Sequence, residues 1–314
     1  MTFEGVTRLD TDTCLIPFAD VTPWRVTGSD HRETMQRLVT QDVRHLAPGD
    51  GRLALLLAPR GQFRALFAVF AGADEFILIA PPGRSEALRA ALAPYLALSK
   101  TRLEPWAGLT VFGIFGPMWR GVVEEFGAAV DGLDGGGWSL SSSGNVTFFA
   151  AGLFGVAGAL AMTTDPNDTL ATLAAAGIAE ADRGALEVAR ITVAFPAWGA
   201  ELDAQTLPPE TGIEDLAISA TKGCYIGQET MARLRTRGHA NRRMVRVHQI
   251  AGPVGGPVLP LALTAAGDEK PRATLTSYAV DPDGRGIGLA MVRREIAEPG
   301  TALLAGPLAF AIVT

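Results

Sequence analysis

The sequence contains few of the residues that disulfide-bonded and metal-binding proteins need. Its 314 residues include two cysteines and four histidines. Cys14 and Cys224 are 210 positions apart, which fits neither a disulfide framework nor the spacing of zinc ligands. The histidines form no H-x-x-H or H-E-x-x-H pattern. We therefore predict no resident metal, and one chain cannot supply four cysteine ligands to an iron-sulfur cluster.

Long apolar runs are also missing, because none reaches the roughly 18 residues that cross a bilayer. The first 12 residues are too polar and acidic for a secretory signal, so we expect a cytoplasmic protein without a membrane partner. A mean hydropathy of +0.21 and 48% hydrophobic residues indicate a compact globular chain rather than a disordered one. At this length the chain accommodates two cores, or one large domain with an appendage.

Strand and helix patterns alternate through the first 244 residues. Apolar runs at 53–57, 63–70 and 76–80 are separated by turn residues, which predicts an antiparallel meander. Pro94 is expected to kink or end the second of the predicted helices. The glycine-rich stretch 131–137 predicts a surface loop. Capping residues and apolar spacing predict helices that start near Asp30, Ser85, Pro117, Asp168 and Gly184.

The pattern changes after residue 244. Four apolar runs between Val245 and Val313 are separated by Gly- and Pro-rich turns, with hardly any helical signal. Such a pattern predicts a small β-barrel or sandwich. The fold class is therefore α+β, with a body over residues 1–244 and a C-terminal β-barrel domain over residues 245–314.

One segment, Lys222–Thr230, brings together a thiol, a cation, two glycines, an amide and a carboxylate within nine residues. Gly223 directly precedes Cys224 and a second glycine follows three positions later, which suits a loop that presents the thiol. The positive charges of Lys222 and Arg233 favour a thiolate, which is both a nucleophile and a metal ligand. The alternative is that Cys224 is a buried small hydrophobic residue and that the glycines only form a turn.

The net charge of −6 argues against a general nucleic-acid binder, but the charge is unevenly distributed. From Lys222 to Arg246 there are seven cations and a single acid, Glu229. Such a stretch favours an anionic ligand: a polyglutamylated cofactor, a phosphate or an RNA backbone. The alternative is a solvated charged face that binds no specific ligand.

The segment Lys222–Glu229 reads K-G-C-Y-I-G-Q-E and matches every fixed position of the K-G-C-Y-x-G-Q-E signature of the YgfZ family of folate-binding proteins. The chain therefore resembles this family, which belongs to the aminomethyltransferase (glycine-cleavage T-protein) superfamily. The resemblance extends over nearly the whole chain. Further similar segments are Trp24–Asp30, Thr40–Val43, Pro59–Gly61, Arg190, Pro196–Glu201, Leu207–Gly212, Arg233, Leu275–Ser277 and Gly286–Gly288.

The resemblance implies an aminomethyltransferase-like folate-binding body around a central ligand channel, followed by a C-terminal β-barrel. It implies an accessory role in iron-sulfur cluster assembly or repair, which would indirectly support tRNA-modifying and other iron-sulfur enzymes. The cofactor would be tetrahydrofolate or a derivative, and the partners iron-sulfur proteins or cluster-assembly factors. Cys224 and Lys222 are then the catalytic candidates, with Lys222 activating the thiol. The candidates for cofactor binding are Gly223, Tyr225, Gly227, Gln228, Glu229, Arg233 and Glu201.

Two departures from the aminomethyltransferases indicate that this chain is not an active member of that enzyme class. Arg64-Ala65-Leu66 stands where those enzymes carry an acidic pair, so the expected partner for proton transfer is missing. The segment Gly155–Leu160 corresponds to their pterin-contacting G-E-D-G-[FY]-E segment, with both glutamate positions apolar.

Three alternative functions stay open. The first is a tetrahydrofolate-dependent aminomethyltransferase, and the second is a non-catalytic scaffold that binds tRNA or another anion. The third is a cysteine hydrolase in which His239, fifteen residues after Cys224, acts as the base. The retained cysteine and the missing carboxylates favour the accessory role over turnover of a folate substrate.

Overall fold

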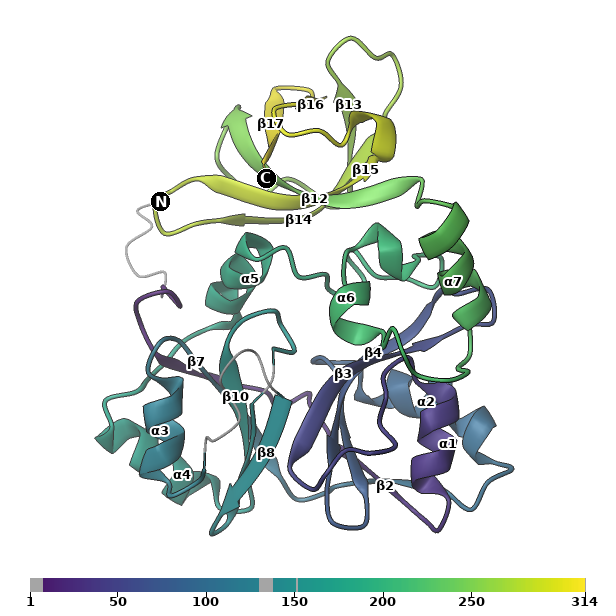
Figure 1. The fold of residues 1–314 in the computed structure, drawn as a ribbon. Coiled ribbons are helices and arrows are strands. Elements are labelled where there is room, and N and C mark those ends of the chain that lie inside the picture. The colour runs from purple at the N-terminus through teal and green to yellow at the C-terminus, as the bar shows by residue number, and fades with distance from the viewer. Residues whose placement is uncertain (1–7, 130–137, 151, 314) are drawn as a thin grey trace.

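The computed structural model describes residues 8–129, 138–150 and 152–313. The chain forms three lobes: two lie side by side in the lower part of Figure 1, and a closed barrel of C-terminal strands lies above them. The loop predicted at 131–137 lies outside the described residues.

Within the described residues, the two lower lobes share one sheet of eleven strands. Neighbouring strands are antiparallel, except that β1 and β11 are parallel. In order across the sheet the strands are β11 (Ala179–Glu180), β1 (Cys14–Pro17), β7 (Thr110–Phe115), β10 (Gly158–Thr163), β9 (Val146–Ala150), β8 (Trp138–Ser143), β3 (Asp50–Leu57), β4 (Phe63–Ala71), β5 (Phe76–Ile79), β2 (Trp24–Thr27) and β6 (Arg102–Pro105). The lobes meet where β3 pairs with β8 through Asp50–Ser139 and Gly51–Trp138, a short ladder that separates two half-sheets.

The half-sheet of β3 and β4 is buried on both faces. Helices α1 (His31–Leu38) and α2 (Ser85–Leu96) cover its outer face, where Ala54 and Leu56 pack with Met35. This double burial explains why β3 reads as an apolar run rather than as an alternating pattern. Pro94 lies in the last turn of α2, two residues before the helix ends.

The half-sheet of β7, β9 and β10 is covered on its outer face by α3 (Trp119–Glu125) and α4 (Pro166–Ala175). Asp165 caps α4 by accepting a hydrogen bond from the main-chain N–H of Asp168. Trp119 and Leu173 are the large apolar residues that these two helices bury against the strands.

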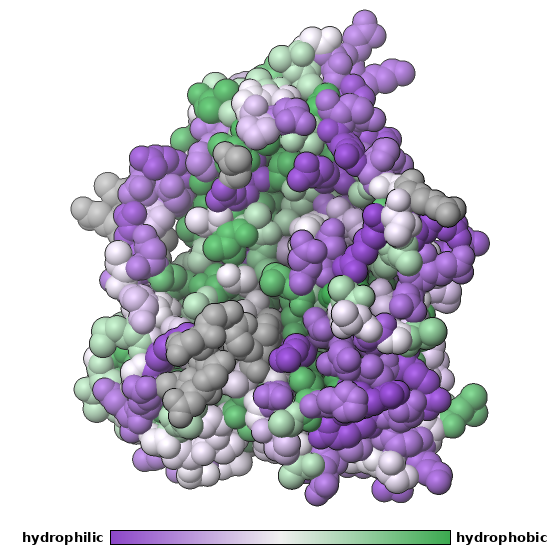
Figure 2. All heavy atoms as spheres, viewed as in Figure 1, coloured by the Kyte–Doolittle hydropathy of each residue, from purple (hydrophilic) through white to green (hydrophobic). Residues whose placement is uncertain are grey.

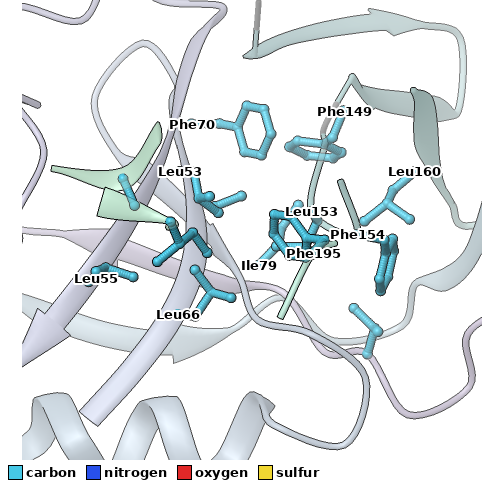
Figure 3. Packing of buried hydrophobic residues seen from close by; sticks show 14 of the residues in the cluster. Leu53, Leu55, Leu66, Phe70, Ile79, Phe149, Leu153, Phe154, Leu160 and Phe195 are labelled. Carbon is cyan, nitrogen blue, oxygen red and sulfur yellow. The ribbon is translucent and has the colours of Figure 1, made fainter. Parts of the chain in front are cut away.

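The inner faces of the two half-sheets enclose the main apolar core (Figure 3). Phe70 of β4 meets Phe149 of β9 edge to face, with ring centroids 4.9 Å apart. Phe18 stacks on Phe154 with a centroid distance of 5.5 Å. Each such pair adds about 0.5–1.5 kcal/mol beyond the burial of its area. The Phe70–Phe149 pair joins the two half-sheets across this core, so the segments above them rest on one base.

A layer of helices separates the lower lobes from the barrel (Figure 1). It consists of α5 (Arg183–Thr192), α6 (Glu214–Ala217) and α7 (Gln228–Arg237), together with a 3-10 turn at Pro208–Glu210. This layer contains the signature segment, which connects α6 to α7.

The C-terminal lobe is a closed barrel of six strands among the described residues. Alternating side chains such as Leu263, Leu275 and Phe310 fill its interior, and each is completely buried. A 3-10 turn, Arg294–Ile296, follows one of the strands. In order around the barrel the strands are β12 (Arg242–Ala251), β15 (Gly286–Arg293), β14 (Ala273–Val280), β13 (Leu261–Ala265), β16 (Ala302–Ala305) and β17 (Leu308–Val313).

The predicted α+β fold with a C-terminal β-barrel is confirmed. The boundary expected between residues 244 and 245 falls inside β12, which already begins at Arg242. A strand expected from Phe154 begins only at Gly158, because Gly155 has a φ of 72° and turns the chain before it. The sequence patterns also gave no sign of α7, β13 or β16.

Candidate functional site

The signature segment forms a loop with one exposed thiol. Gly223 and Cys224 are exposed, so the alternative of a buried, inert Cys224 is wrong. Tyr225 points the other way and is 9% exposed in the main core. At Gly227, which has a φ of 86°, the chain turns into α7. The predicted loop that presents a thiol is therefore confirmed in its geometry.

Lys222, expected to activate the thiol, is instead buried beneath the loop and is 7% exposed. Its ammonium donates hydrogen bonds to the carbonyl oxygens of Gln36, Val39 and Gln41, at 2.7, 2.6 and 2.9 Å. It also lies 5.6 Å from the ring centroid of Tyr225. Burial lowers the pKa of Lys222 to about 8, and the attraction of Asp42 opposes part of this effect. An ammonium group has three N–H donors, and here all three have main-chain partners.

The remaining polar residues of the signature lie at the surface. Glu229 and Arg233 form an ion pair with an N–O distance of 2.6 Å, and their side chains are 85% and 70% exposed. Such a pair contributes little to stability because water screens it. Gln228 is half-buried at the start of α7. Cofactor contacts by Gln228, Glu229 and Arg233, and by Gly223, Tyr225 and Gly227, stay predictions.

Glu201, also expected to bind the cofactor, is fully enclosed by protein and its side chain is 0% exposed. One carboxylate oxygen accepts hydrogen bonds from Arg190 Nη1 and the Ala197 N–H, both at 3.0 Å. The other accepts from the hydroxyls of Thr276 and Ser277, at 2.7 and 2.6 Å. With four donors already bound, Glu201 is not available to a ligand in this structure. It instead ties the body to β14 of the barrel.

Arg190 completes this buried network between body and barrel. It donates to Ser277 Oγ at 2.6 Å and to the Phe195 carbonyl at 2.6 Å. Burial works against its charge, but Glu187 and Glu201 outweigh that effect and raise the pKa of Arg190 above its ordinary value. The guanidinium thus stays charged in the interior and is paired on two sides.

A cavity of about 190 Å³ lies beside this network, between α5, the turn before α2 and the segment that ends at Trp198. Phe18, Phe154 and Trp198 supply aromatic walls. Arg84 lies over the Trp198 ring, with its guanidinium carbon 4.7 Å from the centroid. Burial lowers the pKa of Arg84, and no carboxylate among the described residues pairs with it. Figure 2 shows apolar residues at the base of the central hollow and hydrophilic residues to its left and right.

The cavity is separate from the thiol. Among the described residues that line it, none belongs to the signature segment. The sequence did not single out Arg84, which follows an unremarkable Pro-Pro-Gly turn. Trp198 lies in Pro196–Glu201, one of the segments that resemble the family, and this resemblance was the sequence signal for the cavity.

Two arginines of the basic stretch bind groups of the helical layer. Arg242 pairs with Glu210 at 2.8 Å, and Arg246 donates to the Thr192 carbonyl at 2.7 Å. These two cations hold β12 to the helical layer, so protein groups already engage them. That outcome weakens the case for a scaffold that binds RNA through this segment.

His239 does not face Cys224. The two residues lie beyond opposite ends of α7, whose ten residues make it about 15 Å long. His239 instead lines a polar cleft of about 400 Å³ with Glu214 and Arg243, and burial raises the pKa of Glu214. The cysteine-hydrolase alternative therefore has no geometric support.

The part of the chain that the structure describes contains no cluster of three or more His, Cys, Asp or Glu side chains arranged to hold a metal ion. None of its helices combines the length and the apolar character needed to cross a bilayer.

Comparison with known proteins gives relatives and a fold. No protein-family model matches the chain. It is 26% identical over 230 residues to an uncharacterised protein of Haemophilus influenzae, covering 72% of this chain and 69% of that protein. It is 27% identical over 224 residues to the tRNA-modifying protein YgfZ of Shigella sonnei, covering 69% and 66% of the two chains. The YgfZ of Yersinia pestis is 26% identical over 219 residues, with 69% and 65% covered. The chain thus matches about two thirds of the length of these relatives.

Among solved structures, the chain is similar to the glycine cleavage system aminomethyltransferase T of Bartonella henselae. The TM-score is 0.83 at 16% identity, and the match covers 98% of this chain and 86% of that one. This shows that the chain has the aminomethyltransferase fold. The relatives and the fold together confirm the resemblance to YgfZ-type proteins that the signature indicated.

Proposed function

We propose that this protein is a folate-binding accessory factor for the assembly or repair of iron-sulfur clusters, with Cys224 as its reactive group. The observation that carries the proposal is the exposed Cys224 thiol on the signature loop of an aminomethyltransferase fold. Cys14 is no substitute, because it is buried in β1 and burial raises its pKa to about 11.

The chemistry of one exposed cysteine suggests shared handling of a cluster. A thiolate is a nucleophile and a ligand to iron, but a cluster generally takes about four protein ligands. A single exposed thiol therefore acts together with ligands of another protein. Iron-sulfur proteins or cluster-assembly factors are accordingly the expected partners, and the cluster is cargo rather than a resident group.

In this proposal the pterin ring of tetrahydrofolate, or of a derivative, occupies the cavity beside Arg84 and Trp198. At about 190 Å³ the cavity is smaller than the roughly 300–1,000 Å³ of pockets that enclose drug-sized ligands. It suits one ring system, stacked between aromatic walls, with the glutamate tail outside. The unpaired guanidinium of Arg84 offers hydrogen-bond donors to a pterin carbonyl or to an anionic group.

The cavity also argues against an active aminomethyltransferase. Glu187 is the single carboxylate among the described residues that line it. That carboxylate accepts hydrogen bonds from Arg190, one of them at 2.8 Å from Nε, and is held as an ion pair. Arg64-Ala65-Leu66, where the acidic pair is missing, lie outside the lining of this cavity, and the described lining residues supply no second, unpaired carboxylate in their place.

The link to tRNA is indirect in this proposal. Relatives carry the name tRNA-modifying protein, and enzymes that modify tRNA include iron-sulfur proteins whose clusters need maintenance. Three cations of the basic stretch, Lys222, Arg242 and Arg246, are already engaged by protein groups. Steeply salt-dependent binding of tRNA by the purified protein would favour the scaffold function instead.

Complementation tests the role of the thiol. In a bacterial strain that lacks its own YgfZ, wild type and Cys14→Ala should restore iron-sulfur enzyme activity, whereas Cys224→Ala should not. Equal rescue by Cys224→Ala would overturn the proposal. Calorimetric titration with tetrahydrofolate tests the cofactor separately. Absence of binding would overturn the folate part of the proposal without bearing on the role of the thiol.

A further inference from the structure

The three hydrogen bonds of Lys222 identify what the signature lysine does. Its carbonyl partners belong to Gln36, Val39 and Gln41, so every N–H of the ammonium is committed. No donor remains for Cys224 or for a ligand. The lysine of the signature is thus turned away from the thiol that lies two positions later.

The acceptors lie at the C-terminal end of α1, where helix carbonyls lack partners within the helix. The helix dipole also places partial negative charge at this end, which attracts a cation. Lys222 therefore caps α1 from 186 positions further along the chain than Gln36. Its three short bonds offset part of the cost of burying its charge.

Neighbouring contacts join the same two segments. The Thr40 hydroxyl donates to the Ala217 carbonyl at 2.6 Å, and the Ser219 N–H donates to the Thr40 carbonyl at 3.1 Å. The segment after α1 thus binds the chain on the N-terminal side of Cys224 through main-chain, hydroxyl and ammonium contacts.

The other end of the loop is fixed at Gly227. A Cβ at this position would lie 2.8 Å from the Ala58 carbonyl oxygen and 3.0 Å from Leu57 Cβ. Gly61 is equally tight, because a Cβ there would lie 2.8 Å from the Met231 side chain. Between the two anchors, a Cβ at Gly223 would meet nothing within 4 Å. The exposed thiol is therefore carried on a short open span held at both ends.

We infer that Lys222 is a positioning residue: it fastens the Cys224 loop to the end of α1 and does not act on the thiol through its charge. The inference rests on the proposed function only in taking Cys224 as the reactive group. It replaces the activating role that the sequence suggested for Lys222.

The test measures Cys224 alkylation by iodoacetamide against pH, with mass spectrometry of the peptide to separate it from Cys14. Hydrogen exchange of residues 39–43 and 217–227 is measured in parallel. Lys222→Met and Lys222→Arg are compared with Lys270→Met, which alters an exposed lysine. Arginine keeps the charge, but its planar fork does not reproduce a contact with three carbonyls around one nitrogen.

Both Lys222 variants should lose at least about tenfold of their exchange protection in these two segments, which equals about 1.4 kcal/mol of local opening. The alkylation rate should change in both, while the pH midpoint of alkylation stays at the wild-type value. Lys270→Met should match wild type throughout.

Two results would overturn the inference. One is unchanged exchange protection in Lys222→Met. The other is a midpoint raised by about one unit or more in Lys222→Met and restored in Lys222→Arg, which is the behaviour of a charge that acts on the thiol. If Lys222→Met does not fold, nuclear magnetic resonance of the wild-type ammonium decides: rapid exchange of its protons with water contradicts three buried bonds. These readouts need neither folate nor a cluster, so the proposed function can fail independently.

Discussion

Replacing Glu201 by alanine removes the acceptor of four hydrogen bonds at once and leaves Arg190 with one of its two carboxylate partners. The Glu201 side chain is 0% exposed and that of Arg190 is 5% exposed, so water does not compensate. Removal of one partner of a buried ion pair costs about 3–5 kcal/mol. Glu187 still faces Arg190, so we expect the lower end, about 3 kcal/mol.

Urea unfolding followed by circular dichroism measures this loss, and thermal unfolding gives a second reading. At about 2 °C per kcal/mol for a chain of this size, the Tm should fall by about 6 °C. Glu201→Gln keeps the shape but not the charge, and should cost about 1–2 kcal/mol. Glu229→Ala is the matched control, because its ion pair with Arg233 is exposed and should be worth about 0.5 kcal/mol or less.

A Glu201→Ala protein that unfolds within about 1 kcal/mol of wild type would refute the reasoning. The network would then be dispensable for holding β14 against α5. A loss equal to that of Glu229→Ala would carry the same meaning.

Three further predictions concern the loop and the cavity. The pKa of Lys222 is about 8 in the folded protein and 10.5 for a free lysine. Between pH 8 and pH 10.5 the protein with an opened loop therefore binds more protons than the protein with a closed loop. Hydrogen exchange should therefore show loop opening becoming less favourable as pH rises from 8 to 10.5, by about 1.4 kcal/mol per unit, and Lys222→Met should abolish this slope. Gly227→Ala should destabilise the protein by about 2–4 kcal/mol in urea, because of its positive φ and the nearby Ala58 carbonyl, while Gly223→Ala stays within about 0.5 kcal/mol. Arg84→Met should weaken tetrahydrofolate binding about tenfold in calorimetry without changing the Tm. Arg89→Met, which alters an exposed arginine, should leave the affinity unaltered. Equal affinities for the two variants would show that Arg84 is not part of the binding site.

Local patterns in the sequence predicted most of the fold. The apolar runs that became β3, β4 and β5 are bounded by turn residues, and these signals lie within a few positions of the strands they define. Helix α7 was missed because only Met231 and Leu234 are large apolar residues in its ten positions. Its position depends on close packing of Gly61 and Gly227, which no local pattern reveals. Tertiary contact decided the structure there.

The sequence predicted the exposure of the signature loop but only part of its contacts. The signature named Cys224 and its loop correctly as an exposed element. It gave the wrong orientation for Lys222, because the partners are main-chain carbonyls of a distant helix, and carbonyls carry no sequence signal. Glu201 was assigned to the cofactor for a related reason. Its hydroxyl partners, such as Ser277, belong to a barrel strand, and the sequence motifs do not reveal that this strand lies beside Glu201.

The anchoring of the loop to α1 also has a consequence for the order of events during protein synthesis. Lys222 and Gln36 are separated by 186 positions, and a ribosome that adds about 5–20 residues per second needs on the order of 10–40 seconds to make the intervening chain. Until then α1 has no cap, and a chain truncated before Lys222 has no loop. The Cys224 thiol is therefore presented late in synthesis, after the strands of both lower lobes have been made. In a nascent chain the Cys224 loop therefore becomes ordered only after the segments that anchor it have been synthesised.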